Sequence, residues 1–155
     1  MKAILSLVFV LALAAVPSRA TLGVDVAYNY PLSSWSCLKS NGYQFAIVRC
    51  YQSLGHVDAQ CAPSVQKAWN AGFKNVDLYV FPCPKCGNAT GQIQSLYDYV
   101  KAQNVNYGLI WLDIEGGKYK LSSELIKALL KNRKQIKYIL CVYVFETYMN
   151  GWSIR

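Results

Sequence analysis

The chain has 155 residues, of which 54% are hydrophobic and 15% are charged, and its 16 basic residues outnumber its 8 acidic ones. The hydrophobic fraction excludes a disordered chain, and the length allows one domain with a single core rather than two ordinary domains. The excess positive charge favours anionic partners such as bacterial walls.

Residues 1–20 have the features of a secretory signal peptide. Lys2 supplies the positive start, Ala3 to Val16 are apolar, and Ser18 to Ala20 form a small-x-small cleavage site. The apolar run is shorter than the ~20 residues that a spanning helix needs, and no later run is long enough, so we expect no transmembrane segment. The sequence predicts an exported chain of about 135 residues. We expect it outside the cell or in a lysosome or gut lumen, away from nucleic acid.

Strand and helix patterns then alternate along the chain at intervals of roughly 30 residues, which is typical of βαβ units and a parallel sheet. The predicted strands are 22–27, 45–50, 76–81, 107–114 and 138–145. Four helices are predicted between them. The first two end at Gly42 and Gly72, and the other two cover 91–103 and about 123–135.

The alternation of side chains within the strands favours a barrel over an open doubly wound sheet. Trp111, Asp113 and Glu115 share one face of their strand, and Asp77 and Tyr79 share the matching face of the preceding one. The opposite faces are aliphatic, whereas a doubly wound sheet has two aliphatic faces. A complete eight-unit barrel needs at least ~200 residues. We therefore expect an α/β, TIM-like barrel domain over 21–155, incomplete, with about five parallel strands.

A pair of carboxylates carries the clearest chemistry. Asp113 and Glu115 lie two residues apart near the carboxyl end of a strand, with Cα atoms ~6–7 Å apart. Active sites of parallel α/β folds are built at that end. One protonated and one ionised carboxyl group suit glycoside hydrolysis, and Asp25 at the end of the first strand could join them. The alternative is that the pair is only solvated or caps a helix.

Aromatic residues near the strand ends could stack on sugar rings. The candidates for substrate binding are Trp111, Tyr28, Tyr79 and Tyr119.

Six cysteines follow the signal peptide, and an even number in an exported chain favours disulfides. The candidates are Cys37, Cys50, Cys61, Cys83, Cys86 and Cys141, and the sequence leaves their pairing open. A structural disulfide is the favoured interpretation of Cys83 and Cys86, with a secreted disulfide oxidoreductase as the alternative. No proline follows position 84, which argues against a thioredoxin-like site, and the single histidine, His56, argues against a metal site. We expect no metal and no cofactor.

Asn88-Ala89-Thr90 is an N-glycosylation sequon. It predicts that Asn88 lies on the surface.

Four short motifs occur in order along the chain. They are GVDV at 23–26, GYQFAIVR at 42–49, AGF at 71–73 and WLDIEG at 111–116. Together they resemble the family 25 glycoside hydrolases, lysozymes that cleave between N-acetylmuramic acid and N-acetylglucosamine in peptidoglycan. The nematode- and amoeba-type branch is the more similar one, because its members carry a Phe-Pro-Cys-Pro-x-Cys segment like that at 81–86.

The resemblance implies a modified β/α barrel with its site at the carboxyl ends of the strands. Glu115 matches the family's proton donor, Asp113 the residue that steadies the substrate's N-acetyl group, and Asp25 a carboxylate lining the same pocket. It further implies a secreted, monomeric muramidase that acts on bacterial peptidoglycan in innate defence or bacterial digestion.

The chain departs from the family pattern at two places. Gln52 stands near the position where many members have a glutamate. The family's strand units after Phe145 have no counterpart, which predicts a truncated chain and an incomplete barrel. An inactive, peptidoglycan-binding barrel is therefore the alternative to an active muramidase.

Overall fold

A computed structural model describes residues 21–115 and 141–145, with the side chains of residues 21–113. The predicted signal peptide, the predicted helix at 123–135 and Tyr119 lie outside the described residues. In the part of the chain that the structure describes, no helix is both long and apolar enough to cross a membrane.

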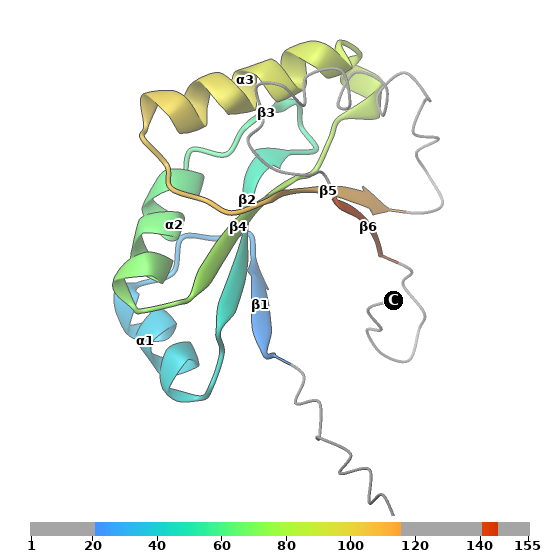
Figure 1. The fold of residues 1–155 in the computed structure, drawn as a ribbon. Coiled ribbons are helices and arrows are strands. Elements are labelled where there is room, and N and C mark those ends of the chain that lie inside the picture. Colours follow the sequence, from blue (N-terminus) through green and yellow to red (C-terminus); the bar gives the residue numbers. More distant parts are fainter. Residues whose placement is uncertain (1–20, 116–140, 146–155) are drawn as a thin grey trace, which may run out of the picture.

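The centre of the molecule is a parallel sheet in the order β1-β2-β4-β5-β6, with the short β3 paired antiparallel to β2 (Figure 1). The strands are β1 (Gly23–Val26), β2 (Phe45–Gln52), β3 (His56–Val57), β4 (Asn75–Val80), β5 (Ile110–Glu115) and β6 (Cys141–Phe145). The predicted α/β class and the parallel sheet of about five strands are confirmed. In the described part of the chain, β1 and β6 are the two edges of this sheet.

Three helices lie along one side of the curved sheet (Figure 1). They are α1 (Leu32–Ser40), α2 (Cys61–Asn70) and α3 (Ala89–Ala102), and a 3₁₀ turn, η1 (Pro84–Cys86), precedes α3. Gly42 and Gly72 follow α1 and α2 with φ angles of +90° and +85°. Only glycine adopts this backbone conformation without a steric penalty, so the predicted helix ends are confirmed.

The core lies between the helices and the aliphatic face of the sheet. Every second strand residue points into it, including Val48, Leu78 and Leu112, all at most 2% exposed. From the helix side, Trp35 of α1 packs edge-on against Phe73, with ring centroids 5.5 Å apart. Burying each of these side chains stabilises the fold by roughly 1.5–3 kcal/mol. The opposite face of the sheet is left to the polar and aromatic side chains.

The hairpin between β2 and β3 was missing from the sequence prediction. β2 extends to Gln52 and turns back at Gly55, whose φ is +89°. A two-residue strand such as β3 has too little side-chain periodicity to be seen in a sequence. The pairing of β2 with β4 also shifts register between Arg49 and Tyr51, a bulge that re-aims the end of the strand.

Among the side chains that the structure describes, two disulfides are present, between Cys50 and Cys61 and between Cys83 and Cys86. Of the six disulfide candidates, Cys37 needs a correction. This residue is a free, exposed cysteine among those the structure describes, on α1, where the amide of Asn41 donates to its sulfur. The side chain of Cys141 lies outside the described residues.

Candidate active site

The register of the sheet brings polar side chains from four strands onto one face. Arg49 of β2 is opposite Tyr79 of β4, and Tyr79 is opposite Trp111 of β5. Residues opposite each other in a parallel pair point to the same side, and so do residues two positions apart in one strand. Asp25, opposite Ile47, and Asp113, two positions beyond Trp111, therefore share this face. The shared face that the alternation predicted for β4 and β5 is confirmed.

Asp25 lies on the edge strand β1, and its side chain is exposed to solvent at the sheet edge. It borders an open groove of about 600 Å³ between β1 and α1. Burial raises the pKa of Asp25 to about 6, and the positive charge of Arg49 partly opposes this shift. The carboxyl group of Asp25 therefore changes charge close to neutral pH, where an ordinary aspartate is fully ionised.

Tyr79 lies between the carboxylates on the same face and is 9% exposed. Burial raises its pKa well above the usual range, the charges of Asp25 and Asp113 raise it further, and Arg49 opposes them. In the strand order, β4 with Tyr79 lies between β1, which carries Asp25, and β5, which carries Asp113. The hydroxyl group of Tyr79 stays protonated at physiological pH and can donate a hydrogen bond.

Asp113 is 6% exposed, near the carboxyl end of β5. Glu115 ends the same strand, two positions further, opposite Phe145 of β6. The backbone therefore places Glu115 on the face of Asp113, while the side chain of Glu115 lies outside the described residues. The structure places Asp25, Tyr79 and Asp113 on one face of the sheet, and Glu115 follows Asp113 on the same strand.

Trp111 lies within β5, opposite Tyr79, whereas Tyr28 lies beyond the carboxyl end of β1. The indole N–H of Trp111 donates to Oδ2 of Asp77 at 2.8 Å, and Asp77 lies one pleat toward the amino end of the sheet from Tyr79. This bond holds the ring of Trp111 toward the amino end of the strands. Tyr28 follows β1 at the carboxyl end and is 62% exposed, edge-on to the ring of Tyr30 at 6.3 Å. Of the two, Tyr28 is the one open to a ligand from solvent.

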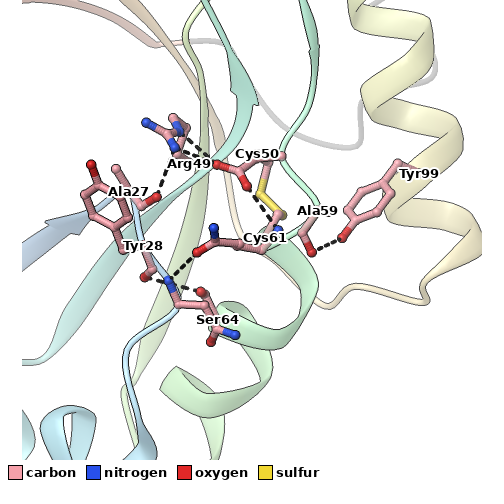
Figure 2. Close-up of polar contacts among 11 residues, drawn as sticks. Ala27, Tyr28, Arg49, Cys50, Ala59, Cys61, Ser64 and Tyr99 are labelled. Atoms are coloured by element: carbon pink, nitrogen blue, oxygen red, sulfur yellow. Dashed lines mark hydrogen bonds and ion pairs between the residues drawn. A yellow bond between two sulfur atoms is a disulfide. The ribbon is translucent and has the colours of Figure 1, made fainter.

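Sequence reasoning missed Arg49, the cation of this face. Its Nε and Nη2 atoms contact Oδ2 of Asp58 at 2.9 and 2.8 Å, and its Nη2 donates to the carbonyl oxygen of Ala27 at 3.0 Å (Figure 2). Its guanidinium also lies over the ring of Tyr28, 6.0 Å from the ring centre. The available signal was a single charge, on the polar face, inside the otherwise apolar strand 45–50.

Comparison with known proteins shows which family the chain belongs to. A family model described as Lysozyme-like protein 1 matches residues 17–150. "Probable GH family 25 lysozyme 2" of Dictyostelium discoideum is 50% identical over 103 residues, which are 66% of this chain and 49% of that protein. The chain belongs to the family 25 glycoside hydrolases. The resemblance that the four sequence motifs indicated is therefore confirmed.

A second relative and a solved structure extend the match of this family 25 chain. "Probable GH family 25 lysozyme 5" of Dictyostelium discoideum is 36% identical over 140 residues, 86% of this chain and 65% of that protein. The fold is similar to the modular autolysin LytC from Streptococcus pneumoniae, solved in complex with a synthetic peptidoglycan ligand. That match has a TM-score of 0.61 at 17% identity and covers 80% of this chain and 32% of LytC. This family 25 chain thus spans about half to two thirds of the length of these two curated relatives.

The Cys83–Cys86 turn of this family 25 chain lies at the end of β4 and is held by one buried glutamine. Gln92 of α3 accepts from the backbone N–H of Cys83 at 3.0 Å and donates to the carbonyl oxygens of Cys83 and Gly87 at 2.9 and 2.8 Å. Three bonds to one side chain are typical of a structural turn, which supports the structural interpretation of this disulfide. Among the described residues, no group of three or more His, Cys, Asp or Glu is arranged to hold a metal ion.

Asn88, the predicted glycosylation site, is exposed at the start of α3. Its side-chain oxygen accepts from the backbone N–H of Gly91 at 3.1 Å and so caps the helix. The predicted surface position is confirmed, and glycosylation itself stays a prediction.

Proposed function

We propose that this chain is a secreted muramidase that hydrolyses the bond between N-acetylmuramic acid and N-acetylglucosamine in bacterial peptidoglycan. Its setting is innate defence or bacterial digestion. Membership of the family 25 glycoside hydrolases supports the reaction class, and the peptidoglycan ligand of LytC supports the substrate class.

One observation carries the proposal: the strand register places Asp25, Tyr79 and Asp113 on one face of the sheet, and Glu115 stands two positions beyond Asp113. Two carboxyl groups on one strand face cannot both ionise easily, so one of them keeps a proton over a wider pH range. Glycoside hydrolysis needs one protonated and one ionised carboxyl group. A strand face that carries both groups, with Asp113 and Tyr79 largely buried on it, supports such a division of roles.

Each side chain then has a role. Glu115, nearest the end of β5, donates the proton to the glycosidic oxygen. Asp113 stays ionised and steadies the substrate's N-acetyl group as positive charge develops at the sugar carbon. Asp25 lines the same pocket, and Tyr79 donates a hydrogen bond from its neutral hydroxyl group. Tyr28 offers an exposed ring on which a sugar can stack.

A turnover assay tests the proposal. Purified chain, from Thr21 onward, is added to Gram-positive cell walls between pH 4 and 8, and clearing and the release of muramic reducing ends are both measured. Glu115→Gln is the control, because a basic protein can disrupt walls without hydrolysis and this variant would keep that effect. Binding to peptidoglycan without any release of reducing ends would contradict the muramidase function and indicate a glycan-binding protein instead.

Secretion is part of the proposal and has its own test. The chain is expressed in a eukaryotic secretory host, and the N-terminus of the protein in the medium is read by mass spectrometry. Cleavage after Ala20 is expected from the small-x-small pattern. Retention in the cell with residues 1–20 attached would contradict it.

A further inference from the structure

Arg49 is the one described cation that links the end of β1 to the carboxylates of the polar face. Its Nη2 atom bonds to the carbonyl oxygen of Ala27, which follows β1 by one residue. Ala27 stands between Asp25 and Tyr28, so this bond holds the segment that carries both. The guanidinium contacts the ring of Tyr28 as well.

The partner of Arg49 is held rigidly. Asp58 is 1% exposed, its Oδ1 atom accepts from the backbone N–H of Gln60 at 3.0 Å, and its own N–H donates to the carbonyl oxygen of Cys50 at 2.9 Å. The Cys50–Cys61 disulfide closes the loop around it (Figure 2). An arginine that binds a fixed carboxylate through two nitrogen atoms has little freedom to move.

We propose that Arg49 is a positioning residue of this site: anchored on Asp58, it holds the end of β1 through Ala27 and keeps a positive charge beside Asp25. The proposal rests on the muramidase function above, because Asp25 and Tyr28 matter through that reaction.

The charges around Asp25 define what Arg49 contributes. Tyr79 faces the same space from β4 and Asp113 from β5, and Asp58 faces Arg49 from the turn before α2. Burial is the main influence that raises the pKa of Asp25, and the positive charge of Arg49 opposes it. Its positive charge lowers the pKa of Asp25, and its removal therefore raises that pKa and leaves less Asp25 ionised at pH 6.

The test uses the whole chain in three variants, Arg49→Gln, Arg49→Lys and Lys74→Gln. Carbon-13 NMR follows the carboxyl group of Asp25 through pH 3–9, with Asp25→Asn to assign its signal, and kcat and KM are measured over the same range. Lys74 is exposed just before β4, at the amino end of the sheet. Lys74→Gln removes the same charge there and is expected to match the wild-type chain in every measurement.

Arg49→Gln is expected to raise the titration midpoint of Asp25 by roughly one pH unit, and the acid limb of kcat/KM by the same amount. Arg49→Lys keeps the charge but loses the planar fork that binds Asp58 and Ala27 together. We expect it to keep the midpoint near the wild-type value and to raise KM several-fold, because Tyr28 and the end of β1 are no longer held.

Two results would overturn the proposal. One is an unchanged Asp25 midpoint in folded Arg49→Gln, or, if that variant does not fold, a midpoint in Arg49→Lys that rises by one unit although the charge is kept. The other is an Arg49→Lys chain whose KM equals the wild-type value. If the wild-type chain has no turnover, the muramidase function fails, while the titration of Asp25 still decides whether Arg49 acts on it.

Discussion

The indole N–H of Trp111 on β5 donates to Oδ2 of Asp77 on β4 at 2.8 Å, and Oδ1 of the same aspartate accepts from the backbone N–H of Leu109 at 2.8 Å. One side chain thus fixes both the start of β5 and the ring below the carboxylates. Gly108 leaves room for it, because a Cβ atom there would meet Oδ1 of Asp77.

Asp77→Ala is expected to destabilise the fold by about 1–3 kcal/mol, since it leaves two partly buried donors without their acceptor. Chemical denaturation followed by tryptophan fluorescence measures the change. Asp98→Ala is the matched control: Asp98 is exposed on α3 and accepts from the amide of Gln94, so a change within about 0.5 kcal/mol is expected. Equal effects of the two variants would show that the Asp77 contacts add nothing.

Glu115→Gln is expected to lower turnover about 100- to 10,000-fold, the range for loss of a general acid, and to spare binding to peptidoglycan. Asp113→Asn is expected to be similarly severe, because the charge that it steadies appears only in the transition state. Reducing-end release and a peptidoglycan pull-down separate the two effects. Near-full activity of Asp113→Asn beside an inactive Glu115→Gln would contradict a paired-carboxylate mechanism.

Asp25 sets the expected dependence on pH. If the reaction needs it ionised, kcat/KM falls with an acid limb near pH 6, where Asp25 gains its proton. Asp25→Asn should lose most activity and that limb together. A limb near pH 6 that persists in Asp25→Asn would assign it to another group.

The raised pKa of Asp25 also predicts the sign of a stability change. Between the ordinary value of 3.8 and about 6, the folded chain binds the proton and the unfolded chain does not. Stability from this group is therefore complete below pH 3.8 and is lost as the pH rises through 6. The difference in stability between Asp25→Asn and the wild-type chain should therefore favour the variant more at pH 7 than at pH 4. Urea denaturation at both pH values measures this, and the opposite sign would contradict a raised pKa of Asp25 in the folded chain.

The Cys50–Cys61 disulfide spans 11 residues and encloses Asp58. Replacing both cysteines by serine is expected to cost about 3 kcal/mol of stability through the entropy of the unfolded chain. The matched variant replaces Cys83 and Cys86, which are 3 residues apart and close a much smaller loop. Thermal unfolding compares the two. A larger loss from the Cys83–Cys86 pair would show that loop closure is not the main term.

Local chemistry made much of the fold predictable. Glycine after a helix predicted the ends of α1 and α2. Alternating aliphatic residues and the spacing of strand and helix patterns predicted the parallel sheet and its two different faces. Each of these signals acts within a few residues. The same alternation put Asp113 and Glu115 on one face of β5, because the period of a strand is two whatever its neighbours are.

By itself, the sequence determined which residue types this protein offers at the carboxyl ends of its strands, and its motifs determined the family. Only the tertiary structure decided which partners they meet. The pairing of Arg49 with Asp58, of Trp111 with Asp77 and of Cys50 with Cys61 depends on strand register and on a hairpin too short to have a pattern. Such contacts join segments that are brought together by packing of the whole sheet, so no local pattern along the chain carries them.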